Sequence, residues 1–316
     1  MTITRLVADM GLLTALLLGG WGAIAAAGAV VAGEPTRGAA PSGGGSPGND
    51  LAYPWRNGIV SGTIATRISP PARFHRLAVA PGGFAAWLRG LPLRAGRPPV
   101  RLYDGRLKAN QVAHFAVIAI DTGRKDLQQC ADAVIRLRAE FLHESGCDDA
   151  IRFRFTSGDP APWARWEAGD RPHVRDDTVT WSRTAAPDSS YANFRRYLDV
   201  VFMYAGTASL AREMDPVSDP SRVEPGNVFI HGGFPGHAIL VVDVAVNDAG
   251  DRVFLLAQSY MPAQDIHILR NPASPETPWY RARSSGPLLT AEWLSRFETL
   301  HRFPPVSCGS DADRAR

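Results

Sequence analysis

The sequence predicts an α+β fold in which N-terminal helices pack on an antiparallel sheet. Two observations predict it. In the first two thirds of the chain, long segments carry apolar residues at three- and four-residue spacing, which is typical of amphipathic helices. In the last third, short apolar segments alternate with turn residues, which is typical of consecutive antiparallel strands.

Three segments have the helical spacing. The first is 83–91, and the third is 191–210. The second begins near Asp126, which can cap a helix, and Gly146 can end it. Cys130 lies on the apolar stripe of this second helix, in its first turn.

Strands are expected where apolar residues alternate with polar ones or form short unbroken runs. The segments 237–246 and 253–258 predict a hairpin, in which Gly250 can adopt a positive φ. Further strands are expected at 100–103, 114–120, 151–155, 228–230 and 266–269.

The first 32 residues predict export. An apolar run from Met10 to Val31 follows Arg5, and Val30-Val31-Ala32 fits a small-residue cleavage site of a signal peptide. A run of about 22 residues could also span a bilayer as an uncleaved anchor. We therefore expect a periplasmic or cell-envelope protein, which touches the membrane only if the anchor is retained.

The rest of the chain predicts one folded domain. Residues 33–50 are rich in Gly, Pro and Ser and indicate a flexible linker. A single α+β domain is expected over 51–305, followed by a polar tail over 306–316. The sequence does not indicate an oligomeric state.

The charge of the chain argues against a nucleic-acid partner. The net charge is only +3, and Lys108 and Lys125 are its two lysines. Basic residues do not cluster, and no aromatic residues are interleaved with them as in nucleic-acid-binding surfaces.

Three cysteines leave an odd thiol in an oxidising compartment. If Cys147 and Cys308 form a disulfide, Cys130 stays free. If none of them pairs, all three could be small buried apolar residues. The sequence leaves both possibilities open.

Cys130 and His237 are the residues that most directly indicate chemistry. A thiol in the first turn of a helix is favoured as thiolate, because unsatisfied N–H groups and the helix dipole attract negative charge. His237 opens a strand after a glycine-rich turn and could reach that thiol as a general base. A cysteine followed by a histidine on a later strand is the papain-like order. Each residue also has a structural interpretation, as a core cysteine and a hydrogen-bonded structural histidine.

Gln258 is the expected orienting group. It ends the strand that pairs with the strand of His237, so it should lie opposite or diagonal to the imidazole. Its amide oxygen would accept a hydrogen bond from Nδ1 and leave Nε2 to face the thiol. Asp243 suits this role less, because six residues of strand place it ~20 Å away.

A polar cluster of four residues surrounds the Asp104-Gly105 turn and is a candidate substrate-binding loop, although a solvated turn would look the same. Its members are Tyr103, Asp104, Arg106 and Lys108. The histidines at 231, 237 and 267 lack the spacing of a metal site, so neither a metal nor a cofactor is expected.

At these residues the chain resembles a family of bacterial exported proteins that is filed as a domain of unknown function. The matching stretches cover most of residues 67–281. They are Leu-Tyr-Asp-Gly-Arg-Leu-Lys (102–108), Gln-Gln-Cys-Ala-Asp-Ala-Val-Ile-Arg-Leu-Arg-Ala-Glu (128–140), Tyr-Ala-Gly-Thr-Ala-Ser-Leu (204–210), Gly-Gly-Phe-Pro-Gly-His-Ala-Ile-Leu-Val-Val-Asp (232–243) and Phe-Leu-Leu-Ala-Gln-Ser-Tyr-Met-Pro-Ala-Gln-Asp-Ile-His (254–267).

A more remote resemblance indicates chemistry. Glu-Pro-Gly-Asn-Val-Phe-Ile (224–230), the stretch from Gly236 to Asp243 and the strand ending at Gln258 are similar to the second half of NlpC-type and CHAP-type cysteine peptidases. Those enzymes have a papain-like fold and cleave peptide or amide bonds of the bacterial cell wall. The surroundings of Cys130 depart from both types, because the Asp-Cys-Ser-Gly of the NlpC type is missing.

The sequence thus predicts an exported cysteine hydrolase that acts on an amide or peptide bond of the cell envelope. Cys130 would be the nucleophile, His237 the general base and Gln258 the orienting group. Backbone N–H groups of Gln129 and Cys130 would form the oxyanion hole. Two alternatives are a non-catalytic module of the same fold that binds cell-wall peptide or glycan, and a structural envelope protein.

Overall fold

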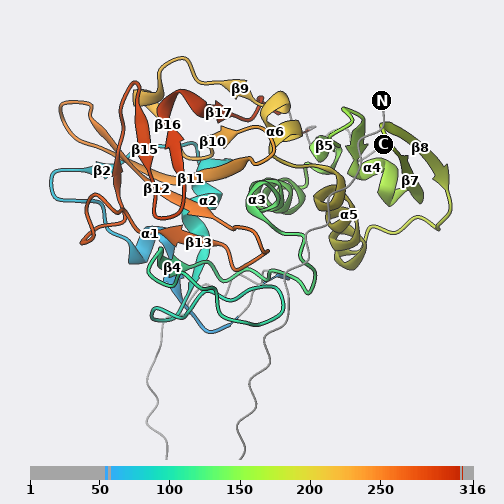
Figure 1. Cartoon of the computed structure of the whole chain (residues 1–316), viewed down its shortest axis with the longest axis horizontal. Helices are drawn as coiled ribbons and strands as arrows, with labels where there is room; N and C mark the ends of the chain where they lie inside the picture. Colours follow the sequence, from blue (N-terminus) through green and yellow to red (C-terminus); the bar gives the residue numbers. More distant parts are fainter. Residues whose placement is uncertain (1–53, 56–57, 307, 309–316) are drawn as a thin grey trace, which may run out of the picture. The chain divides into compact units, whose positions relative to one another are not determined.

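The computed structural model describes residues 54–55, 58–306 and 308 (Figure 1). The expected signal peptide or anchor (1–32) and the expected linker (33–50) lie outside the described residues, as does most of the tail. The described residues belong to one compact unit. Within them, every helix is too short or too polar to cross a membrane.

An antiparallel sheet forms the centre of the unit, and the expected α+β class is confirmed. Its central strand, β11 (His237–Val246), pairs with β10 (Val228–His231) and β12 (Arg252–Gln258). The hairpin between β11 and β12 turns through Gly250 with a φ of 84°, as expected. The sheet is completed by β13 (His267–Leu269), β4 (His114–Val117), β17 (Leu300–Arg302) and β9 (Asp215–Pro216), and by the short strands β2 (His75–Arg76) and β14 (Tyr280–Arg281).

Both faces of β11 are covered, which explains its largely apolar sequence. Ala238, Leu240 and Val242 point to the larger core, on the face where the helices pack. Ile239 and Val241 point to a second core on the opposite face. A bulge between Val241 and Asp243 shifts the pairing with β12 by one residue. After the bulge, Val244 points to the second core and Ala245 to the larger core.

Helix α3 (Cys130–Glu144) packs on β11 and carries most of its side chains into the larger core (Figure 1). Its N-cap is Gln129, so the expected cap at Asp126 is wrong. The Asp132 carboxylate accepts a hydrogen bond from the Gln129 N–H at 3.0 Å. Asp126 instead accepts one from the Ala263 N–H at 2.7 Å, which ties this segment to the loop after β12.

The expected helix over 191–210 is two helices, α5 (Tyr191–Tyr204) and α6 (Thr207–Glu213). Ala205 and Gly206 have extended backbones, and the Ser209 hydroxyl accepts a hydrogen bond from the Gly206 N–H at 3.0 Å. The apolar spacing continues through the break, which is why periodicity alone does not reveal it. The other helices are α1 (Ile64–Arg67), α2 (Phe84–Gly90), α4 (Trp163–Glu167) and the 3₁₀ turns η1 (Asp148–Ala150), η2 (Pro220–Arg222) and η3 (Phe297–Thr299).

Most expected strands are present, with two differences. Residues 100–103 form only isolated bridges, at Arg101 and Leu102, and the strand expected over 114–120 ends at Val117. Outside the main sheet, the described residues form four two-stranded sheets, of which the sequence predicts only the strand at 151–155. The two-stranded pairs are β1 (Val60–Thr63) with β3 (Pro92–Arg94), β5 (Arg152–Arg154) with β6 (Pro160–Pro162), β7 (Asp170–Arg175) with β8 (Thr178–Arg183), and β15 (Pro287–Leu289) with β16 (Leu294–Arg296).

Cys147 and Cys308 form a disulfide, and Cys130 is a free thiol. Of the two possibilities that the sequence left open, the first is therefore confirmed. The disulfide joins the chain just after α3 to the segment that follows β17, and so closes a loop of 161 residues.

Asp243 has a structural role. Its side chain is fully buried at the bulge of β11 and accepts hydrogen bonds from Arg76 Nε at 2.8 Å and Arg89 Nε at 2.5 Å. Removing one member of a buried ion pair leaves the remaining charge without compensation, which destabilises proteins strongly.

We expect Asp243→Asn to lower the free energy of unfolding by about 3 kcal/mol, measured by urea denaturation. Asp248→Asn, in the exposed hairpin turn of β11 and β12, is the matched control and should change it by less than about 0.5 kcal/mol. Equal effects of the two substitutions would show that Asp243 does not anchor β2 and α2 to the sheet.

Candidate active site

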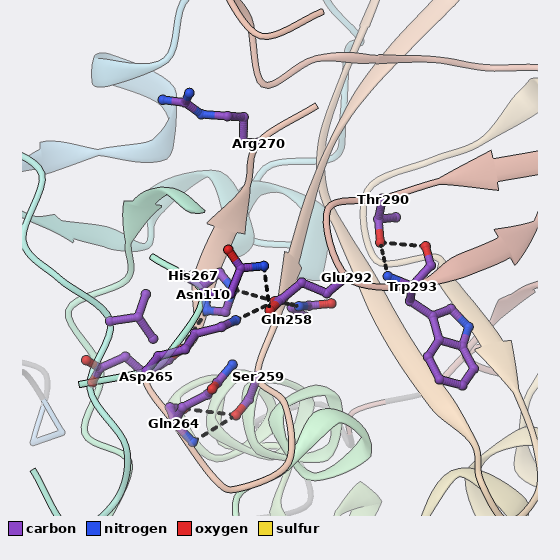
Figure 2. Close-up of polar contacts among 12 residues, drawn as sticks. Asn110, Gln258, Ser259, Gln264, Asp265, His267, Arg270, Thr290, Glu292 and Trp293 are labelled. Atoms are coloured by element: carbon purple, nitrogen blue, oxygen red, sulfur yellow. Dashed lines mark hydrogen bonds and ion pairs between the residues drawn. The ribbon is translucent and has the colours of Figure 1, made fainter. Parts of the chain in front are cut away.

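Hydrogen bonds from the loop after β12 fix the segment that leads into α3. The Ser259 hydroxyl donates to the Gln128 carbonyl at 2.8 Å, and the Ala263 N–H donates to Asp126. Figure 2 shows Ser259 and Gln264 of this loop facing each other. Because β12 is paired with β11, this loop places Cys130, the first residue of α3, against the start of β11.

The Cys130 thiol lies beside backbone N–H groups. The Ala238 N–H, one residue after His237, lowers the pKa of the thiol, and the N–H groups of Ala131 and Cys130 itself also favour the thiolate. The expected contribution of Gln129 to an oxyanion hole is wrong, since its N–H already donates to the Leu127 carbonyl at 2.7 Å and to Asp132. Of the two donors expected for the oxyanion hole, the Cys130 N–H remains a candidate.

Burial dominates the electrostatics of the thiol. Desolvation raises the pKa of Cys130, and the nearby Asp132 carboxyl raises it further, against the N–H groups that lower it. The expectation of a thiolate at rest is therefore wrong. The preference of a helix terminus for negative charge is the weaker effect when the group loses contact with water.

His237 is held rigidly at the first position of β11. Its side chain is buried, and the Tyr260 and Trp293 rings each lie 5.0 Å from the imidazole, centroid to centroid. A Cβ on the preceding Gly236 would come within 2.1 Å of Thr207 Oγ1, so only glycine fits there. Burial lowers the pKa of His237 to about 4, so the imidazole is neutral at neutral pH.

Gln258 meets His237 as expected, but at the other nitrogen. Leu240 pairs with Ala257, which makes Gln258 the diagonal neighbour of His237 on β12. The His237 Nε2–H donates to Gln258 Oε1 at 2.9 Å. The expected bond to Nδ1 is wrong, because a long side chain on a diagonal position reaches the outer edge of the ring. The lone pair of the neutral ring is then on Nδ1.

Glu292, which sequence reasoning missed, fixes the orientation of Gln258. The Gln258 amide nitrogen donates to Glu292 Oε2 at 2.9 Å, so its oxygen faces the histidine. Figure 2 shows Glu292 between Gln258 and Asn110, whose amide donates to Glu292 Oε1 at 3.3 Å. Lys108 forms a buried ion pair with Glu292. A single acidic residue in a loop gives no periodic signal from which this contact could be predicted.

The four residues of the predicted substrate loop separate in the structure. Lys108 joins the Glu292 network, and Tyr103 lines a cavity of about 520 Å³ together with Arg94, Arg101 and Arg124. Asp104 and Arg106 are exposed and pair with each other at 2.6 Å. Of the four residues, the structure thus brings only Lys108 to the His237 network.

The described part of the chain has no group of three or more His, Cys, Asp or Glu side chains arranged to hold a metal ion. His267 is fully buried, and its Nδ1–H donates to the Asp265 carbonyl at 2.9 Å. Its Nε2 lies 4.0 Å from Glu292, so this histidine packs at the far side of the same network.

The family described as "Domain of unknown function (4846)" matches residues 64–302. The chain belongs to this family. The matched range contains Cys130, His237, Gln258 and Glu292, so every member of the network lies within the shared domain. No curated protein and no solved structure matches the chain.

The lowered pKa of His237 predicts a pH dependence of stability. The unfolded histidine titrates near 6.5 and the folded one near 4, so between these values the unfolded state binds more protons. The stabilisation is therefore present above pH 6.5 and is lost as the pH falls towards 4. We expect acidification from pH 7 to pH 4 to lower the unfolding free energy of the wild type by about 3 kcal/mol more than that of His237→Gln. If wild type and His237→Gln lose the same unfolding free energy on acidification, measured by urea denaturation, the lowered pKa of His237 is contradicted.

Proposed function

We propose that the protein is an exported cysteine hydrolase of papain-like arrangement that cleaves an amide or peptide bond of the cell envelope. The observation that carries the proposal is the hydrogen-bonded series from His237 to Glu292, with the Cys130 thiol near the residue that follows His237. Cys130 lies at the Ala238 N–H, His237 donates to Gln258, and Gln258 donates to Glu292. A nucleophile, a base and a group that orients the base are the parts that covalent acyl transfer requires.

The tautomer of His237 defines the proton path. Because Gln258 accepts from Nε2–H, the lone pair of the neutral ring is on Nδ1. Nδ1 takes the thiol proton while Sγ bonds to the substrate carbonyl carbon, whose oxygen becomes an oxyanion. The Nδ1 proton then passes to the leaving nitrogen as the C–N bond breaks, which leaves a thioester and a free amine. Water attacks the thioester, Nδ1 takes its proton, and the C–S bond breaks as the proton returns to sulfur.

The shifted pKa values support general-base attack rather than a resting ion pair. Burial keeps the thiol protonated and the imidazole neutral over the same pH range. The thiol can therefore lose its proton only during attack, when the Cys130 N–H faces the developing oxyanion.

Two observations support export and an envelope substrate. The Cys147–Cys308 disulfide is of the kind that persists in oxidising compartments, and residues 1–32 have the pattern of a signal peptide or anchor. The envelope substrate rests on the resemblance of residues 224–258 to cell-wall peptidases.

Alkylation kinetics test the neutral resting pair. We expect the rate of Cys130 labelling by iodoacetamide to rise with pH through a midpoint above about 8.5, because burial raises the thiol pKa. His237→Gln should leave this midpoint unchanged. A plateau of fast labelling between pH 5 and 7 that His237→Gln abolishes would instead indicate a thiolate–imidazolium pair, for which labelling rates are set by the histidine.

Turnover tests the function itself. Wild type incubated with peptidoglycan fragments should release new amines, detected by mass spectrometry, and Cys130→Ala should lower the rate by at least about 10³-fold. Gln258→Ala should lower kcat about 10²-fold by freeing the imidazole. It should also lower the unfolding free energy by about 1–3 kcal/mol, since Gln258 is buried between two partners.

Gln264→Ala is the matched control, because Gln264 is equally buried but its side-chain nitrogen has no hydrogen-bond partner among the described residues. It should retain kcat. If Cys130→Ala still releases amines from the peptidoglycan fragments at the wild-type rate, the cysteine mechanism is excluded. Fragment binding without release by the wild type would identify a binding module instead.

A further inference from the structure

A second cavity, of about 530 Å³, lies beside the middle of α3, away from Cys130. Its walls come from α3, β5, the end of α6 and the segment 303–306 that follows β17. Four arginines line it: Arg138, Arg152, Arg154 and Arg212.

Arg138 is a buried cation that has no anionic partner among the described residues. Only 7% of its surface is exposed, and its guanidinium nitrogens, which no described residue accepts from, keep contact with the cavity. Three aromatic rings surround it, those of Phe84, Phe141 and Phe303, with centroids 5.0, 5.5 and 5.1 Å away. The ring faces stabilise the charge, but they do not replace acceptors for the in-plane N–H groups.

Arg136, one half-turn earlier on the same helix, shows what a satisfied buried arginine looks like in this protein. It donates to Glu140, to Gln128 at 2.9 Å and to Asp121 at 2.9 Å. Buried charges are normally paired in this way. Arg138 lies on the same helix without such partners, and its guanidinium lines the cavity instead. Burial lowers the pKa of Arg138 to about 10, which still leaves it charged at neutral pH.

The walls of the cavity do not supply the missing charge. Arg154 and Arg212 donate to the carbonyls of Gly158 and Thr156, which are neutral. Among the described residues, Glu213 is the one acidic residue lining the cavity, and its Oε1 accepts from the Arg154 backbone N–H at 2.6 Å. Burial raises the pKa of Glu213 to about 7, so its own negative charge is incomplete at neutral pH.

We propose that this cavity binds a small organic anion, a carboxylate on an apolar body, with Arg138 as its deepest partner. The planar guanidinium fork matches a carboxylate, and the surrounding phenylalanine and proline side chains suit an apolar body. The site is distinct from the proposed catalytic centre, because eight residues of helix place Arg138 ~12 Å along α3 from Cys130.

Calorimetric titration of the full-length, disulfide-bonded protein tests the proposal, with phenylacetate as probe and neutral phenylacetamide as its isosteric control. We expect phenylacetate to bind at least tenfold more tightly than the amide. Arg138→Met, which keeps the apolar length of the side chain, should weaken phenylacetate binding at least tenfold. Arg175→Met, an exposed charge on β7, should leave it unchanged.

Equal binding of the acid and the amide, or undiminished binding by Arg138→Met, would overturn the proposal, and so would no binding of phenylacetate to the wild type. Inorganic phosphate is a second probe, and tighter binding of phosphate than of phenylacetate would overturn the carboxylate assignment. If Arg138→Met fails to fold, Arg152→Gln, at the exposed edge of the cavity, provides the comparison. It should weaken phenylacetate binding twofold or more.

Discussion

The pairing of β12 with β11 is the interaction on which the candidate site depends. It places Gln258 diagonally from His237, and the chain leaving β12 then binds the segment before Cys130 through Ser259. A slip of this pairing by one residue would turn every side chain of β12 to the other face of the sheet. Gln258, which shares a face with Phe254 and Leu256 of the second core, would then point toward the larger core, away from the histidine. The buried alternation on both faces of β11 opposes such a slip, so the packing of the cores also fixes the geometry of the site.

The network behind His237 orients the histidine at an energetic cost. The side chains of Lys108 and Glu292 are only 6% and 10% exposed, and the desolvation of such a pair commonly offsets most of its attraction. Its effect is orientation: Glu292 accepts the amide hydrogen of Gln258 and so turns the amide oxygen toward Nε2. The charge of Lys108 also adds to the lowering of the His237 pKa. The histidine thus keeps one tautomer and one protonation state.

The sequence predicts well what depends on local pattern. The β11–β12 hairpin, Gly250 in its turn, Cys130 in the first turn of a helix and Gln258 beside His237 all follow from apolar spacing and strand pairing. It does not predict contacts between polar residues that are distant in the chain, and Glu292 reaches Gln258 from a loop more than thirty residues away. Prediction from the sequence also fails where a local preference, such as apolar periodicity or the helix dipole, competes with burial. The break at Gly206 and the protonated thiol are both outcomes of packing that periodicity does not contain.

The protonated thiol shows how magnitude decides between two opposing effects. A helix N-terminus stabilises an adjacent negative charge by about 0.3–1 kcal/mol, or less than one pKa unit. Full burial can shift a pKa by 3–5 units in the opposite direction. Cys130 is partly buried, so the desolvation effect is smaller than that limit but still exceeds the helix effect. The resting site therefore contains a neutral thiol, a neutral imidazole and a neutral amide, and the charged pair of Lys108 and Glu292 lies behind them. In the proposed reaction, charge would first develop in the transition state, where the Cys130 N–H would serve as a donor to the oxyanion.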